Sequence, residues 1–166
     1  MKKVKKIFPA LVVLSWLYVV FSMLQPVEIV AVHHDKFTTD ILVKNFPLTN
    51  QRKIDWWKKN AGALNKKYPF ILNESGETFW ITIWDFKDGY QQEKPDDTTF
   101  FPSHSTDHLL CFEEIKAAER CIRKENWLML VTRATTGTIS YTMKGASYYQ
   151  KTDGPLTLEK RVFDAH

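Results

Sequence analysis

The sequence predicts an α+β fold class: an N-terminal transmembrane helix, then an antiparallel β-sheet domain with one main packed helix and a short disulfide-linked helix. Three observations predict it: an uncharged run at residues 7–24, an apolar helical stripe after residue 50, and alternating apolar residues in most later segments. We expect residues 1–25 to form a cytoplasmic basic tail and transmembrane anchor, and residues 26–166 to form one exported domain of ordinary size.

The run at residues 7–24 is long enough to cross a membrane. A helix that spans the ~30 Å hydrocarbon core needs about 20 apolar residues, and this run has eighteen uncharged ones. Positive charge before a span stays on the cytoplasmic side. Such charge is present as Lys2, Lys3, Lys5 and Lys6. We therefore expect a single pass, with the N-terminus in the cytoplasm and the remaining chain exported.

A cleaved signal peptide is the alternative interpretation of this run. The apolar core of a signal peptide is usually ~7–15 residues and ends at small residues. This run is longer, contains Trp16, Tyr18 and Phe21, and meets Pro26 instead of a small-residue exit. A retained anchor is preferred, and cleavage before Met23 stays open.

The basic composition does not indicate a nucleic-acid partner. Four of the 23 Lys and Arg residues precede the apolar run, which leaves 19 against the 19 Asp and Glu of the exported part. Binding to phosphate backbones needs clustered excess positive charge. The pI near 9.0 therefore reflects membrane topology.

The first exported segments predict a hairpin and a helix. Strands are expected at residues 28–32 and 38–44, with a turn at residues 33–36. Thr49 or Asn50 then caps a helix to about Lys67, because apolar residues recur on one stripe. The stripe consists of Ile54, Trp57, Ala61, Leu64 and Tyr68.

The later segments predict further strands around one long loop. Residues 78–86 are apolar on both faces, so we expect a central strand that the helix covers on one side. Residues 87–108 are polar and broken by prolines, which predicts a loop. More strands are expected, at residues 127–133, 138–143, 146–151 and 156–162.

Cys111 and Cys121 both fall in the exported part. An even pair in an oxidising compartment predicts a disulfide, and two free buried thiols are the alternative. Ten residues of unbroken helix would separate the Cα atoms by ~15 Å, whereas a disulfide needs less than ~7 Å. The helix expected within residues 112–119 must therefore end early, and the chain must double back.

No segment carries a recognised signature of catalysis or of cofactor binding. Asp85 and Asp88 lie three apart at a predicted strand end, where sites often occur. A turn accounts for Asp88, so a hydrolase built on these two carboxylates is only the alternative. The histidines at 33–34 and at 104 and 108 are interpreted as exposed loop residues. We expect no enzyme activity, no cofactor and no metal.

Four aromatic residues are candidates for contact with another protein. Trp56 lies about 100° from the buried stripe of the helix, and Trp is enriched in interface hot spots. The edge of the core and a membrane-interface position are its alternatives. Tyr90, Phe100 and Phe101 belong to the long loop, where prolines flank the two phenylalanines.

Several runs in combination carry a resemblance to a known family. They are PVEIVAVH at 26–33, LVKNFP at 42–47, KIDWW at 53–57, ITIWDF at 81–86, DGY at 88–90, LCF at 110–112 and CI at 121–122. Together they resemble the enterobacterial membrane proteins of domain-of-unknown-function family 943. The resemblance implies a bacterial inner-membrane protein, so that the exported domain is periplasmic. It implies no activity and no catalytic residues.

The leading hypothesis for function is a binding module. Residues 7–24 would hold the chain in the lipid bilayer, and the periplasmic domain would bind another protein. That partner would be an envelope component or a toxin that the domain neutralises, as an immunity protein does. Nothing in the sequence separates these two partners.

Overall fold

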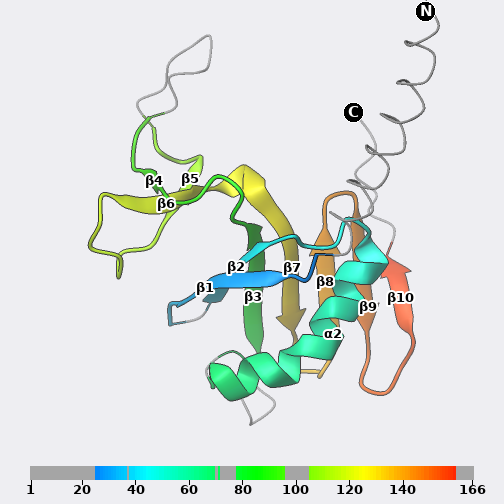
Figure 1. The fold of residues 1–166 in the computed structure, drawn as a ribbon. Helices are drawn as coiled ribbons and strands as arrows, with labels where there is room; N and C mark the ends of the chain where they lie inside the picture. Colours follow the sequence, from blue (N-terminus) through cyan, green and yellow to red (C-terminus); the bar gives the residue numbers. More distant parts are fainter. Residues whose placement is uncertain (1–24, 37, 70, 72–77, 96–104, 160–166) are drawn as a thin grey trace, which may run out of the picture.

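The computed structural model describes residues 25–159 apart from 37, 70, 72–77 and 96–104 (Figure 1). The elements are β1 (Glu28–His34), β2 (Thr38–Lys44), α2 (Asn50–Lys67), β3 (Phe79–Asp85), β4 (Gln91–Gln92), β5 (Leu109–Cys111), β6 (Glu119–Arg123), the 3-10 helix η1 (Lys124–Asn126), β7 (Trp127–Arg133), β8 (Ile139–Met143), β9 (Ala146–Gln150) and β10 (Leu156–Glu159). The described chain is therefore mostly β-sheet.

Seven strands form one mixed sheet, called sheet A, in the order β1-β2-β3-β7-β8-β9-β10. The predicted all-antiparallel sheet is wrong, because β2 and β3 are parallel, with Ile41 beside Ile83. Parallel neighbours need a long crossover connection, and the segment with α2 provides it here, because it returns the chain to the end of the sheet where β2 begins. β3 lies between β2 and β7 as a central strand.

Helix α2 packs its apolar stripe on one face of sheet A. Thr49 is the N-cap, and its side chain accepts a hydrogen bond from the Arg52 backbone N–H. Ile54, Trp57 and Leu64 are buried against the sheet. The predicted bounds of this helix are confirmed, because both the cap and the stripe are local signals.

Three short strands form a second sheet, called sheet B, in the order β4-β6-β5. Figure 1 shows it beside sheet A, on the side away from β10. The predicted short helix at residues 112–119 is wrong. Cys111 and Cys121 instead face each other across β5 and β6, with a Cα–Cα distance of 3.9 Å. A directly paired hairpin leaves only a turn between them, so the chain doubles back without a helix.

The predicted fold class also needs correction for its transmembrane helix, which is not among the described elements. No helix within the described ranges is long and apolar enough to cross a membrane. The expected transmembrane helix at residues 7–24 lies outside the described residues.

Two hydrophobic cores hold the layers together. The larger lies between α2 and sheet A and includes Ile41, Ile83 and Val131. The smaller lies on the opposite face of sheet A, where Leu42 and Trp84 pack against the sheet B region. Alternation along β2 and β3 sends neighbouring side chains into different cores. Sheet B is thus fixed to one face of sheet A.

Candidate functional site

A four-residue contact joins the β1–β2 hairpin to the sheet B region. We call it the His33 clamp, and its members are His33, Tyr90, Phe112 and Glu114. The imidazole of His33 stacks on Phe112, with ring centroids 3.8 Å apart and planes at 18°. Its Nδ1 lies 2.6 Å from Glu114 Oε1, and its Nε2 lies 2.7 Å from the Tyr90 hydroxyl. Both ring nitrogens of His33 therefore make contacts that connect the β1–β2 hairpin to the sheet B region.

The partners of His33 determine its hydrogen bonds. An ionised carboxylate only accepts, so Nδ1 of His33 donates to Glu114. Nε2 accepts from the Tyr90 O–H in the neutral form of the ring and donates to the Tyr90 oxygen in the charged form. Burial, and secondly the charge of Glu114, raise the pKa of the Tyr90 phenol. A carboxylate, an imidazole and a hydroxyl in series resemble a nucleophile relay, but the raised pKa opposes phenolate formation. The clamp is suited to holding the two parts together.

A cleft of about 330 Å³ opens between the end of the β1–β2 hairpin and the β5 region. We call it the acidic cleft, because four carboxylates line it: Asp35, Asp40, Glu113 and Glu114. Asp40 lies opposite His33 in the β1–β2 register and accepts a hydrogen bond of 2.7 Å from Trp84 Nε1. Burial raises the pKa of Asp40, although the bond from Trp84 and the nearby His33 act in the opposite direction.

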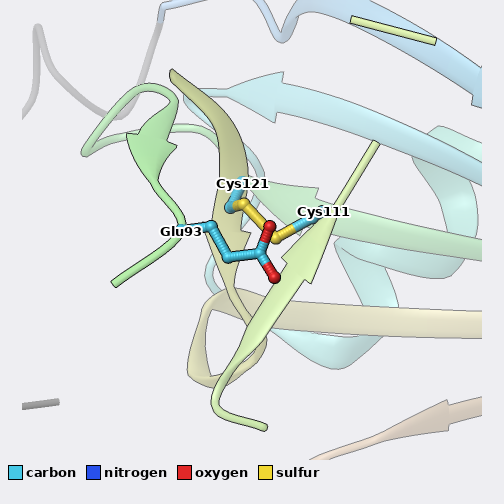
Figure 2. Close-up of side chains that lie close together, drawn as sticks. All are labelled: Glu93, Cys111 and Cys121. Carbon is cyan, nitrogen blue, oxygen red and sulfur yellow. A yellow bond between two sulfur atoms is a disulfide. The ribbon is translucent and has the colours of Figure 1, made fainter. Parts of the chain in front are cut away.

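The predicted disulfide is confirmed. Cys111 and Cys121 are bonded, and Figure 2 shows the carboxylate of Glu93 pointing toward the sulfurs. The ligand atoms of these three residues lie within 4.8 Å of one another. The sulfurs are bonded to each other and offer no thiolate, so this group is not a metal site. Glu93 instead pairs with Arg120 at 2.9 Å.

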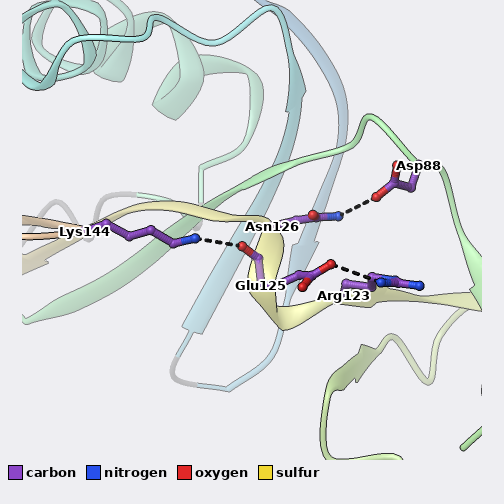
Figure 3. Close-up of polar contacts among 5 residues, drawn as sticks. All are labelled: Asp88, Arg123, Glu125, Asn126 and Lys144. Carbon is purple, nitrogen blue, oxygen red and sulfur yellow. Dashed lines mark hydrogen bonds and ion pairs between the residues drawn. The ribbon is translucent and has the colours of Figure 1, made fainter. Parts of the chain in front are cut away.

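A second pocket, of about 380 Å³, lies where α2 begins and β3 ends, and Lys53, Lys87 and Lys144 line it. Lys53 donates to the backbone carbonyl of Leu128 at 3.4 Å. Lys144 donates to the backbone carbonyl of Glu125, also at 3.4 Å (Figure 3). Burial, and then the charge of Lys144, lower the pKa of Lys53. The pocket is therefore rich in cations that are not neutralised by direct ion pairs among the described residues.

The two carboxylates of the alternative hydrolase are placed differently. Asp85 lines the cationic pocket. Asp88 is exposed, is not among the residues lining that pocket, and accepts a hydrogen bond of 3.3 Å from Asn126 Nδ2 (Figure 3). The structure thus brings Asp85 together with lysines and Asp88 together with an amide.

The four predicted contact residues do not gather in one place. Trp56 is half-buried, packs edge-to-face on Phe46 at 5.1 Å, and lines a pocket with Pro26 at the start of the described chain. Tyr90 is in the His33 clamp. Phe100 and Phe101 lie outside the described residues, within the connection between β4 and β5.

Sequence reasoning missed two residues of this region. The interpretation of His33 as an exposed loop residue is wrong, because it lies in β1 and its side chain is only 11% exposed. Trp80 on β3 is 47% exposed, although the strand reads as apolar on both faces. Its register partner Thr38 lines the acidic cleft. Trp80 shares its strand face with Thr82 and the buried Trp84, so the sequence pattern gave no signal for its exposure.

Residues 1–160 match the family described as enterobacterial putative membrane protein (DUF943). The chain belongs to this family. The family description agrees with the expected membrane association, and it names no activity, ligand or partner. Neither the curated proteins nor the solved structures include a match to the chain.

Proposed function

We propose that this DUF943 chain is a membrane-anchored periplasmic binding module without enzyme activity. Residues 7–24 form the anchor, the N-terminus is cytoplasmic, and the domain binds another protein in the periplasm. The grounds for the anchor are the uncharged run and the four lysines before it. The partner is an envelope component or a toxin of the kind that an immunity protein neutralises.

The observation that carries this proposal is the rigid cleft between the hairpin and sheet B. A disulfide closes sheet B, and the His33 clamp fixes the sheet B region to sheet A. A prearranged surface loses less entropy on binding than a flexible one. The cleft carries four carboxylates, and the exposed Trp80 pairs across β2 and β3 with Thr38, which lines the cleft. Tryptophan next to fixed charge is typical of a protein-binding surface.

Phe100 and Phe101 stay part of the proposal as contact residues. They fall between β4 and β5 in the sequence and lie outside the described residues. Four clustered carboxylates favour a partner that presents lysine or arginine side chains.

Photo-crosslinking in living cells tests the proposed surface. A benzoylphenylalanine at position 80 is expected to capture one periplasmic protein, and the same group at Leu158, which is exposed on β10, is expected not to. Glu113→Lys, which reverses an exposed charge outside the clamp, is expected to abolish capture at position 80. Equal capture at positions 80 and 158, or capture unaffected by Glu113→Lys, would show that the cleft is not the contact surface.

A further inference from the structure

One end of sheet A carries the start of the described chain. Glu28, at the start of β1, pairs with Lys44 at the end of β2. Val43 then lies beside Asp85 at the end of β3, and the last residues of β3 pair with the start of β7. The β8–β9 turn brings Lys144 to the same end. We call this the anchor end, because residue 25 continues directly into residues 1–24.

The anchor end has an excess of positive charge. Three adjoining pockets there are lined by six cationic side chains and by three carboxylates, Asp55, Asp85 and Glu125. If Glu28 is added as a fourth carboxylate, six cations against four anions still leave +2. We call the six cations the basic surface, and they are Lys44, Arg52, Lys53, Lys59, Lys87 and Lys144. The acidic cleft lies at the opposite end of β1 and β2.

The cations of the basic surface form no ion pair with a described carboxylate, although Lys53 and Lys144 donate to backbone carbonyls and Lys44 lies over the Phe86 ring. Within the described residues, none of the six lies within 4.0 Å of a carboxylate oxygen. Glu125 is instead paired with Arg123 at 3.1 Å. All but Lys53 are exposed. Residues 26–166 balance to zero net charge, but their positive charge is concentrated where the chain enters residues 1–24.

Apolar side chains accompany this charge. Leu48, in the loop between β2 and α2, is 78% exposed and lines two of the three pockets, the two that Lys53 and Lys87 also line. Trp56 lines the third pocket together with Pro26 and Val27. Trp56 contacts the ring of Phe46, which lines one of the pockets that Leu48 lines, so the third pocket adjoins the other two. Basic residues around Leu and Trp are the composition that binds membrane interfaces.

We propose that the anchor end rests on the anionic phospholipid surface of the membrane, with Leu48 and Trp56 in the interface and the basic surface against lipid phosphates. The inference rests on the proposed anchor: if residues 7–24 span the bilayer, residue 25 follows residue 24 by a single Cα–Cα step of ~3.8 Å. That continuity keeps the anchor end at the membrane and favours lipid over a diffusing protein as its occupant. The acidic cleft then points away from the membrane.

Vesicles that contain the full chain test this orientation. Leu48→Cys is labelled with a polarity-sensitive fluorophore, while the native cysteines stay in their disulfide. We expect a blue-shifted emission in vesicles that contain phosphatidylglycerol, and a loss of the shift in vesicles of phosphatidylcholine alone. About 1 M salt should also reduce the shift, because it shortens the Debye length to ~3 Å. The same label at Lys36, in the opposite hairpin turn, should report water throughout.

Charge reversals test whether the shift depends on the lysines of the basic surface or only on the net charge of the protein. Lys59→Glu with Lys87→Glu should abolish the shift of the label at residue 48, since each lysine near an anionic surface contributes about a fivefold preference for the docked state. Lys116→Glu with Lys151→Glu changes the net charge equally at exposed positions elsewhere and should leave the shift intact.

Resistance to extraction at alkaline pH shows whether residues 7–24 are integrated in the membrane, and it does not depend on the lipid contact of the anchor end. An extractable protein would overturn the anchor, and the orientation with it. An integrated protein whose label at residue 48 reports water in both lipids would overturn the lipid contact alone. An equal shift in both lipids would contradict the role of the basic surface. A shift that appears only when a second protein is added would assign the anchor end to a protein partner.

Discussion

At the scale of single residues, His33 should make the largest polar contribution to the joint between the hairpin and the sheet B region. His33→Phe keeps an aromatic ring to stack on Phe112 but removes the hydrogen bonds to Tyr90 and Glu114. We expect the free energy of unfolding to fall by about 1–3 kcal/mol, because the half-buried Tyr90 hydroxyl is left without its partner. Urea titration measures this value. Glu113→Gln, at an exposed neighbour, is the control and should unfold at the wild-type midpoint.

Asp40 should make stability depend on pH. Burial raises its pKa above the usual 3.8 in the folded state, so between 3.8 and the folded pKa the native protein holds a proton that the unfolded chain has lost. Stability therefore falls as pH rises through this window. Asp40→Asn keeps an acceptor for Trp84 Nε1 but has no charge to desolvate. We expect this variant to be more stable than wild type at neutral pH, with the difference disappearing below pH 3.8.

Urea titrations of both proteins at several pH values check this prediction. Glu113→Gln, which removes an exposed carboxylate of the same cleft, should show no comparable change in the pH dependence. An Asp40→Asn variant that is less stable at neutral pH would mean that attraction to His33 outweighs the cost of burying the charge.

The role of His33 could not be predicted from its sequence neighbourhood. A histidine pair followed by Asp and Lys is typical of an exposed turn, and the partner Glu114 is 81 residues away. Burial of His33 depends on a sheet that forms from strands of only two to five residues. Cys111 and Cys121 were predictable as a pair, since compartment and even number are properties of the sequence alone.

At the scale of elements, the disulfide should account for much of the stability of sheet B. The bond closes a loop with a sequence separation of 10, and the chain-entropy relation gives about 2–3 kcal/mol for such a loop. We expect Cys111→Ser with Cys121→Ser to lose that amount and to raise amide hydrogen exchange in β5 and β6 before β7 and β8.

Reductant provides the control for this prediction. Dithiothreitol should destabilise the wild type to the level of the double serine variant and should not change the variant. Equal loss of protection across sheets A and B would show that the two sheets unfold as one unit.

Elements with a strong local pattern were predicted well. Thr49, the apolar stripe and Lys67 bound α2 correctly, and β2 and β7 have the predicted ends. The failures concern relations between elements. The parallel β2–β3 pairing was missed, although the helix between the two strands provides the long crossover that a parallel pair needs. β4 is two residues long and has no periodicity to detect.

At the scale of the whole molecule, the arrangement of charge suggests how the domain is oriented. Residues 26–166 have equal numbers of acidic and basic residues, yet the anchor end gathers cations and the far end of the hairpin gathers carboxylates. One end is thereby suited to an anionic bilayer and the other to a cationic protein surface. A lipid contact at the anchor end would present the acidic cleft to the periplasm.

Membrane topology gives the last prediction. A C-terminal reporter that works only in the periplasm should be active on the wild type if, as proposed, the lysines before residues 7–24 hold the N-terminus in the cytoplasm. Substitution of Lys2, Lys3, Lys5 and Lys6 by Glu should lower that activity and raise the activity of a reporter that works only in the cytoplasm. Substitution by Arg is the matched control and should leave the wild-type pattern. A cytoplasmic signal on the wild type would contradict the topology, and a mature N-terminus at Met23 would show cleavage instead of anchoring.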